Sequence, residues 1–446
     1  MTSLNGSVLL AHGFGGQNDL PVPLSAALVA GAAALVASFA VLALAWRTSR
    51  FRGDGSGHPL PRWLAGCIDA RVTRAIVVTL ALAFTAWVTM AALFGKNLLV
   101  NPTFGTVYAL LWVGLLPAAV LFGPIYRLCN PLRWVHRALT RVVGIDRTRG
   151  LRRCPPWLGC WPAALLLLAF VWLELANPSY SQDLTVVRWW FLAVGVTALV
   201  GAVVYGDSWF ERADPFEVYS DLVARLSPFG RRSDGTLVIR NPLENLDGLA
   251  PMPGLPAVVA VLFGSTCFDS FKDSQHWLQL SLAHPDHASL LNTAGLLGFC
   301  VVVFGTFLLA SAATAGVGQT VRRGLPGQLA HSIVPIIVGY IVAHYLTFFV
   351  SVGIGTMQEL GDPLSRGWQW SSWLAGLNKY AIFEHPTAIA VTKVVAVVVG
   401  HVLGVVAAHD RAVKLLPRRH VVTGQLPLLA LMVGYTLTGL WLLFSA

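Results

Sequence analysis

Residues Gln328 to Val352 read QLAHSIVPIIVGYIVAHYLTFFVSV. At ~1.5 Å of rise per residue, a helix of this length crosses the ~30 Å hydrocarbon core of a bilayer. The stretch contains His331 and His344, and an ionisable side chain inside a membrane is costly enough to indicate a function. Pro335 cannot donate a hydrogen bond to the carbonyl of His331, so we expect that carbonyl to be free and the helix to kink there. We expect the rest of the chain to pack around this helix.

The composition assigns the chain to the membrane proteins. Of its 446 residues, 55% are hydrophobic and only 12% are charged, whereas about 25% are charged in an average soluble domain. The mean hydropathy is +0.65. The six cysteines are scattered without a C-x-x-C pair, so we interpret them as small buried hydrophobic residues.

Apolar runs long enough to span a bilayer as helices recur along the chain. Residues 1–20 precede the first run and lack both the basic start and the apolar length of a signal peptide. The sequence therefore predicts an all-α, polytopic transmembrane helix bundle of about ten spans. Five spans lie in residues 21–206, a cytoplasmic loop occupies 207–254, and five more spans lie in 255–446. The predicted spans are 21–46, 73–95, 104–126, 156–176, 184–206, 255–271, 290–314, 328–352, 386–408 and 425–445.

The basic residues predict the orientation in the membrane. If the N-terminus is outside, 25 of the 31 Lys and Arg residues fall in cytoplasmic loops. This bias follows the positive-inside rule and predicts that both termini lie outside. It also explains the net charge of +10 without nucleic acid as a partner, because basic loops face anionic lipid headgroups.

Two predicted cytoplasmic helices begin in the same way. Asn130 is followed by Pro131, and Asp214 is followed by Pro215, so each pair supplies an N-cap and a proline in the first turn. We expect two amphipathic helices lying in the membrane plane, either packed on the membrane surface or docking a protein partner. They cover residues 130–143 and 215–227, with apolar stripes at Leu132, Val135, Leu139 and Val142 and at Phe216, Tyr219, Leu222 and Leu226.

Three predicted spans each carry an ionisable side chain at the same depth in the membrane. Glu174, Asp269 and His344 each lie near the outer end of a span, and His12 emerges from the N-terminal tail on the same side. Carboxylates and imidazoles are ligands of Zn²⁺ and Cu²⁺. We therefore expect Glu174, Asp269 and His344 as catalytic candidates and His12, Asp269 and His344 as metal ligands. The alternatives are an ion pair of Glu174 with Arg188 and a hydrogen bond of Asp269 to nearby backbone.

A second candidate cluster lies in the inner half of the membrane. It comprises His331, His401, His409 and Asp410. His344, His331 and His401 would form a ladder across the bilayer for protons or a metal ion. Paired intramembrane histidines also hold b-type haem, which is a less favoured cofactor here because spacing alone does not place them on facing helices. The alternative is that each histidine makes an ordinary hydrogen bond between helices.

Several short motifs occur in order along nearly the whole chain. They are Ala11-His12-Gly13 followed by Asp19-Leu20-Pro21-Val22-Pro23, Trp172-Leu173-Glu174-Leu175, Phe268-Asp269, His331-Ser332-Ile333-Val334-Pro335 with Ala343-His344-Tyr345, Asp362-Pro363-Leu364 with Gly367-Trp368, and Gly400-His401-Val402 with Ala408-His409-Asp410-Arg411-Ala412. With these motifs the chain resembles a family of largely actinobacterial polytopic membrane proteins, some of which are labelled fenitrothion hydrolase. The resemblance implies hydrolysis of organophosphate-type esters at the membrane. It brings no established catalytic residues with it.

Three functional hypotheses follow. The first is a hydrolase in which a divalent metal near the outer face activates water against an apolar phosphotriester. The second is a transporter or metal-handling protein that uses the histidine ladder. The third is a non-catalytic membrane subunit. An enzyme requires its polar groups at one depth, whereas a carrier requires them at successive depths. The expected partners are the lipid bilayer and either a small apolar molecule or a metal ion.

Overall fold

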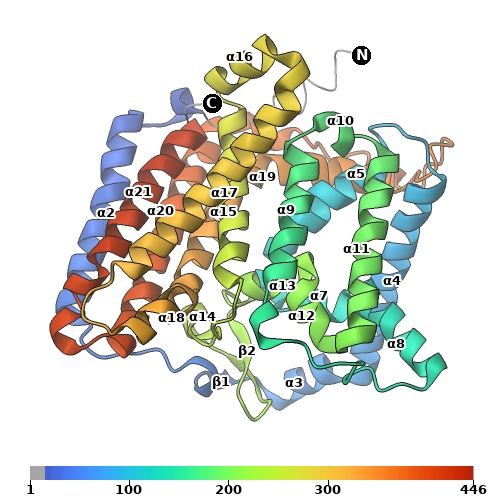
Figure 1. The fold of residues 1–446 in the computed structure, drawn as a ribbon. Coiled ribbons are helices and arrows are strands. Elements are labelled where there is room, and N and C mark those ends of the chain that lie inside the picture. Colours follow the sequence, from blue (N-terminus) through green and yellow to red (C-terminus); the bar gives the residue numbers. More distant parts are fainter. Residues whose placement is uncertain (1–15, 445–446) are drawn as a thin grey trace.

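The computed structural model describes residues 16–444, and most of this backbone is helical, which confirms the all-α class (Figure 1). The helices are α2 (Leu24–Ala45), α3 (Arg62–Asp69), α4 (Arg71–Phe94), α5 (Pro102–Gly105), α6 (Leu115–Phe122), α7 (Ile125–Cys129), α8 (Pro131–Val143), α9 (Trp161–Leu175), α10 (Pro178–Ser181), α11 (Leu184–Tyr205), α12 (Phe210–Ala213), α13 (Pro215–Ala224), α14 (Pro242–Asp247), α15 (Leu255–Lys272), α16 (Gln275–Ala283), α17 (Ala288–Ala312), α18 (Gln319–Leu329), α19 (Val334–Glu359), α20 (Pro386–Leu415) and α21 (Leu426–Phe444). Three short strands, β1 (His58–Pro59), β2 (Phe229–Arg231) and β3 (Leu237–Ile239), form an antiparallel sheet in the order β1-β3-β2. The sequence predicted only a compact loop where β2, β3 and α14 occur.

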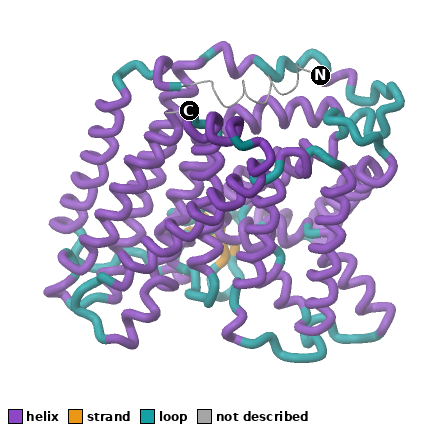
Figure 2. Tube along the Cα trace, turned by 45° about the horizontal axis from the view of Figure 1, so that its top comes forward, coloured by secondary structure: helices purple, strands orange, loops and turns teal. Residues whose placement is uncertain are grey.

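The helices have the lengths and composition of membrane spans. Within residues 16–444, nine helices are long and apolar enough to cross a bilayer, and a bent pair of helices makes a tenth. These are the positions at which the sequence predicted ten spans. The helices run beside one another and the connecting loops gather at the two ends of the bundle (Figure 2). This is the architecture expected of an integral, multi-pass membrane protein.

The third predicted span is broken. It was expected to be continuous over 104–126, but α5 is followed by a π-helix, η3 (Thr106–Val113), and then by α6, with a bend of 42°. Pro117 explains the break, because it has no N–H to donate to the carbonyl of Val113. Non-helical or irregular backbone at membrane depth is tolerated where protein surrounds it or where it lines a cavity. Here η3 is largely buried and packs against α19.

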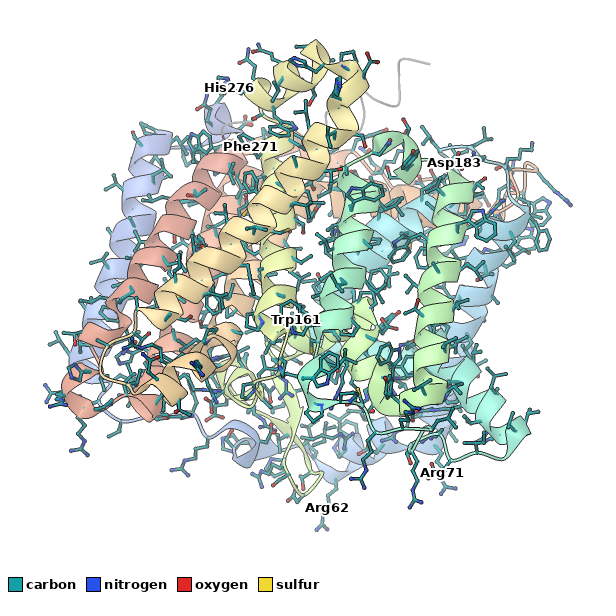
Figure 3. The ribbon with its side chains drawn as sticks, in the orientation of Figure 1. Arg62, Arg71, Trp161, Asp183, Phe271 and His276 are labelled. Atoms are coloured by element: carbon teal, nitrogen blue, oxygen red, sulfur yellow. The ribbon has the colours of Figure 1, made fainter. Side chains whose placement is uncertain are left out.

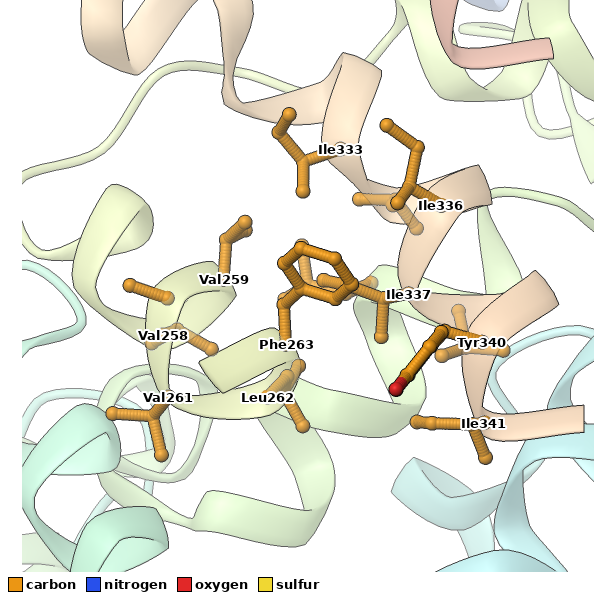
Figure 4. Packing of buried hydrophobic residues seen from close by; sticks show 14 of the residues in the cluster. Val258, Val259, Val261, Leu262, Phe263, Ile333, Ile336, Ile337, Tyr340 and Ile341 are labelled. Carbon is orange, nitrogen blue, oxygen red and sulfur yellow. The ribbon is translucent and has the colours of Figure 1, made fainter. Parts of the chain in front are cut away.

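Helix α19 lies at the centre of the bundle, as the sequence predicted. It packs most extensively against α20 and also against α15 and the broken span. Gly339 and Gly400 make the approach of α19 and α20 possible, because a Cβ at either position would collide with a backbone carbonyl of the other helix. On its other side α19 contacts α15 through branched and aromatic side chains, including an edge-on contact of Phe263 with Tyr340 at 5.6 Å between ring centroids (Figure 4).

The predicted kink at Pro335 is wrong. A short 3₁₀ turn, η7 (Ala330–Ile333), ends directly before α19, and Pro335 occupies the first turn of the α-helix. A proline is tolerated in a first turn because that N–H has no partner within the helix. The carbonyl of His331 is not free either, since it accepts a hydrogen bond from the N–H of Val334.

The two ends of the bundle differ in charge. Arg62 and Arg71 lie at one end, which also carries α3 and α8, and Phe271 and His276 lie at the other (Figure 3). We call the first the basic end and the second the opposite end. The loop around α16 projects from the opposite end (Figure 1).

The two predicted amphipathic helices exist, but only one lies at the surface. Helix α8 is capped by Asn130 and exposes Val135, Leu139 and Val142, as expected for a helix at the membrane interface. Helix α13 is capped by Asp214 as predicted, yet nearly every residue in it is buried. It packs against α6 and α9 inside the bundle, so the prediction that it packs on the membrane surface is wrong.

Candidate functional site

Asp269 and His344 meet inside the bundle, near its opposite end. Asp269 comes from the last turns of α15 and His344 from the middle of α19, and the exposed fractions are only 3% and 8%. His344 Nε2 lies 3.0 Å from Asp269 Oδ2. Because a carboxylate only accepts hydrogen bonds, Nε2 carries the proton when Asp269 is ionised. The sequence placed both residues at one depth, and the fold brings them into contact.

Four further side chains complete a hydrogen-bonded chain. Tyr345 donates to Asp269 Oδ2 at 2.6 Å, and the ammonium of Lys272 lies 3.1 Å from Asp269 Oδ1. On the other side of the imidazole, Ser270 Oγ lies 3.0 Å from His344 Nδ1 and accepts from Tyr340 at 3.0 Å. We call Asp269, Ser270, Lys272, Tyr340, His344 and Tyr345 the Asp269 cluster.

Glu174 approaches the Asp269 cluster from α9. It lies close enough to Asp269 and Lys272 to interact with both electrostatically. The Glu174 side chain is only partly buried as a whole, but its Oε2 atom is buried and makes no hydrogen bond. The sequence predicted only that Glu174, Asp269 and His344 lie at one depth, and the structure places Glu174 and His344 close to Asp269. Their catalytic role stays a prediction.

The broken span adds polar atoms of its own beside Glu174. Tyr108 and Trp112 belong to the π-helix η3, and neither the Tyr108 hydroxyl nor the Trp112 indole N–H makes a hydrogen bond of normal geometry although both are buried. Tyr108 interacts electrostatically with Glu174, and Trp112 lies beside Tyr345. Buried polar groups normally have partners, so this concentration of unpaired ones marks a place where water or a ligand would be stabilised.

The sequence left two alternatives open, an ion pair of Glu174 with Arg188 and a hydrogen bond of Asp269 to nearby backbone, and the structure gives contacts of both Arg188 and Asp269. Arg188 donates to the backbone carbonyl of Ala92 rather than to Glu174. Asp269 accepts hydrogen bonds from His344 and Tyr345 of α19 and pairs with Lys272 of α15.

The structure describes two of the three predicted metal ligands, Asp269 and His344. His12 lies outside the described residues. Within residues 16–444, no group of three or more His, Cys, Asp or Glu side chains is arranged to hold a metal ion. Asp269 and His344 bond to each other, and Lys272 holds the second carboxylate oxygen, so this pair does not fit a metal centre by itself. The metal, Zn²⁺ or Cu²⁺, stays a prediction.

In the part of the chain that the structure describes, the members of the second predicted cluster each bond to other groups. His331 bonds the carbonyls of Gln328 and Ala407, and His401 Nδ1 lies 2.8 Å from the carbonyl of Val397. These are ordinary contacts of helix side chains with backbone. His401 Nε2 is buried without a partner.

His409 and Asp410 have a structural role at the basic end. His409 lies between the side chain of Gln425 and the carbonyl of Trp46. Asp410 accepts from the indole of Trp46 at 2.9 Å, from Ser49 at 2.8 Å and from the N–H of Arg50 at 2.7 Å. Together they fasten the loop after α2 to the end of α20.

A separate polar core joins α8 and α13 outside the membrane spans. Arg133 bonds Glu217 through two nitrogens, with Nε at 2.7 Å, and Asn130 donates to Asp214 at 2.9 Å. Burial and the neighbouring carboxylate of Glu217 raise the pKa of Asp214 to about 6, against the opposing effect of the hydrogen bonds that it accepts. These side chains are saturated with one another, so we interpret them as structural.

Sequence reasoning missed Ser270, Tyr340, Tyr345 and Lys272. Ser270 and Tyr345 are the immediate neighbours of Asp269 and His344, and Lys272 stands three residues after Asp269, the spacing of an ion pair within a helix. That spacing was the available signal. No family model, curated protein or solved structure matches this chain.

Proposed function

We propose that the protein is a proton-coupled membrane transporter and that the Asp269–His344 pair is its proton-binding site. One observation carries the proposal: a hydrogen-bonded chain of titratable side chains connects α15 to α19 at membrane depth, beside a membrane helix that is broken. Intramembrane carboxylates and histidines serve as proton relays in pumps and transporters. Broken helices form the binding sites of many secondary transporters.

The contacts give a physical reason for coupling. Asp269 on α15 accepts hydrogen bonds from His344 and Tyr345, both on α19. A hydrogen bond to a charged group contributes ~1.5–3 kcal/mol and a neutral one ~0.5–1.5 kcal/mol, so protonating Asp269 weakens two contacts between these helices by about 2–3 kcal/mol in all. Reversing a 1:99 equilibrium between two conformations takes about 5.5 kcal/mol. One proton therefore supplies about half of that free energy, which shifts an equilibrium between two arrangements of α15 and α19 by a factor of roughly 30 to 150.

The wider arrangement fits this function. Hydrogen bonds run from Tyr340 through Ser270 and His344 to Asp269, whose second carboxylate oxygen lies against Lys272. Glu174 and the buried polar groups of Tyr108 and Trp112 lie next to the cluster and offer polar atoms to which cargo or water would bond. With the orientation that the basic loops predict, the cluster faces the outside of a bacterial plasma membrane. The cargo we propose is a small apolar molecule or a metal ion.

The test measures proton binding without knowledge of the cargo. Proteoliposomes on a solid-supported membrane are given a pH jump, and the transient current from protonation is recorded. We expect a current in the wild type that is reduced at least tenfold in Asp269→Asn and in His344→Gln. His276→Ala, an exposed histidine at the same end of the bundle, is the matched control and should retain the current. A wild-type current that persists in Asp269→Asn would refute the assignment.

A hydrolase is the second candidate, because Ser270, His344 and Asp269 are connected in the order of a nucleophile, a base and an orienting acid. Both contacts measure 3.0 Å, the geometry by which such a triad is recognised. This candidate agrees with the resemblance to membrane proteins labelled fenitrothion hydrolase. In it, the imidazole takes the Ser270 proton and Asp269 stabilises the resulting imidazolium.

A fluorophosphonate probe separates the two candidates. If Ser270 is a nucleophile, the probe labels the wild type in membranes and does not label Ser270→Ala, and apolar phosphotriester hydrolysis is lost with the label. Ser281→Ala, a serine on α16 outside the cluster, serves as the control. Absence of specific labelling, together with a protonation current that survives in Ser270→Ala, removes the hydrolase and leaves the transporter.

A further inference from the structure

An apolar groove opens between α4 and α8. Its volume is about 550 Å³, and its lining is almost entirely apolar. From α4 it is lined over a stretch from Leu82 to Phe94, and from α8 by Pro131, Trp134 and Ala138. Twelve residues of helix advance by ~18 Å, which is close to the length of an extended phospholipid acyl chain. The groove therefore has the shape and chemistry for one hydrocarbon chain.

The outer faces of both helices indicate that lipid surrounds the groove. Helix α4 exposes Leu80, Phe84 and Phe94, and α8 exposes Val135 and Leu139. Exposed apolar side chains on this scale are unfavourable in water. We infer that the groove opens to the bilayer.

The α8 side of the groove carries uncompensated positive charge. The guanidinium of Arg137 lies over the ring of Trp134, with its carbon 4.4 Å from the ring centroid. Neither Arg137 nor Arg141 forms an ion pair with any residue from 16 to 444, whereas Arg133 is fully engaged by Glu217.

The surroundings of the Arg137 side chain favour the binding of an anion. Its Nε atom is buried without a hydrogen-bond partner. Burial, and then the nearby charges of Arg147, Arg133 and Arg141, lower the pKa of Arg137, and only Asp207 opposes them. Asp207 is itself shared between His136 and Arg147. An anionic group beside Arg137 would relieve this repulsion and satisfy the unpaired nitrogen.

We propose that the groove between α4 and α8 is a binding site for an anionic phospholipid. One acyl chain lies along α4 between Leu82 and Phe94, and the phosphate of the headgroup binds Arg137 and Arg141. Basic pockets at the end of a membrane bundle select anionic lipids in this way. The site lies on α4 and α8, away from the Asp269 cluster of α15 and α19, and the inference does not depend on the proposed transport function.

The test compares two lipids with the same acyl chains. Purified full-length protein is titrated with phosphatidylglycerol or phosphatidylcholine, and binding is followed by native mass spectrometry. We expect phosphatidylglycerol to bind at least tenfold more tightly than phosphatidylcholine. In Arg137→Gln/Arg141→Gln this preference should disappear. Arg62→Gln/Arg71→Gln removes the same charge from exposed positions at the same end and should keep the preference (Figure 3).

A second variant tests the groove itself. Ala138 lines the groove and is exposed, so Ala138→Trp fills it from the lipid side while leaving both arginines in place. We expect this variant to lose the tight binding of phosphatidylglycerol. Equal affinity for both lipids in the wild type, or an unchanged preference in Arg137→Gln/Arg141→Gln or in Ala138→Trp, would overturn the proposal. Competition by millimolar inorganic phosphate alone would overturn it too, because the ligand would then be a free anion.

Discussion

Replacing Asp221 with asparagine should remove a pH dependence of stability that a buried carboxyl imposes on α13. The Oδ1 atom of Asp221 is buried without a hydrogen-bond partner. Burial raises the pKa of this carboxyl from 3.8 to about 7, and the carboxylate of Glu217 adds to the effect, while Arg127 and Arg225 oppose it. The folded state therefore favours the neutral acid over most of the acidic range.

The sign of the effect follows from proton binding in the two states. Near pH 3 the carboxyl is neutral in both the folded and the unfolded chain. As the pH rises from 4 to 7, the unfolded chain ionises while the folded one keeps its proton, so the free energy of unfolding falls. Above pH 7 the folded chain also ionises, and the loss remains constant.

The magnitude follows from the two pKa values. A separation of about three pH units corresponds to ~4 kcal/mol, at 1.36 kcal/mol for each unit. Because Asp221 keeps partial exposure as a whole side chain, solvent screens part of this cost. We take about half, ~2 kcal/mol, as the expected value.

The assay is the free energy of unfolding in mixed micelles of dodecyl maltoside and dodecyl sulfate. We expect Asp221→Asn to exceed the wild type by about 0.5 kcal/mol at pH 4.5 and by about 2 kcal/mol at pH 8. Asp234 is the matched control, because backbone and side-chain hydrogen bonds from Thr236 lower its pKa, so Asp234→Asn should bring no gain at pH 8. A difference between Asp221→Asn and the wild type that is the same at both pH values would refute the reasoning.

Three further predictions test the packing. Glu217→Gln removes the charged partner of the buried Arg133 guanidinium and should lower the free energy of unfolding by ~3–5 kcal/mol. Adding Arg133→Met should recover more than half of this loss. Additive losses in a double-mutant cycle would contradict this prediction. Gly400→Leu should abolish a monodisperse peak in size-exclusion chromatography because its side chain would collide with α19, while Gly434→Leu, which meets open space, should not. Asp410→Asn weakens three hydrogen bonds to the loop after α2, so trypsin should cleave that loop at least fivefold faster in Asp410→Asn than in the wild type.

Hydropathy predicted most of the fold because a span in lipid is recognised by its length and composition. The same measure could not detect the break in the third span, since η3 and α6 are as apolar as a continuous helix. The signal there was Pro117, whose missing N–H ends the regular hydrogen-bond ladder. Pro335 carries the same signal, but the preceding turn places it at a helix start, where a proline has no such effect.

The sequence predicted the depth of the candidate residues along their spans, but it did not predict the direction in which their side chains point. Counting residues along each span placed Asp269 and His344 at one level, and the fold brings them into contact. Which side chains face inward could not be read off, because a helix with lipid on one side and an apolar core on the other has no polar face to reveal its orientation. Tyr345 is an example, because in the sequence it is one aromatic residue of a span among others, and its hydrogen bond to Asp269 becomes visible only when α15 packs beside α19.

The similar starts of α8 and α13 explain why one helix is internal and the other is not. Arg133 and Glu217 occupy the same position, three residues after the N-caps Asn130 and Asp214, with opposite charges. The fold places the N-termini of α8 and α13 side by side. The N-cap Asn130 therefore bonds the N-cap Asp214, and Arg133 bonds Glu217. Burying such a pair is tolerable only when each partner satisfies the other. With Arg133 committed to α13, helix α8 turns its apolar side outward beside the exposed Arg141, and that apolar side forms one wall of the groove on α4.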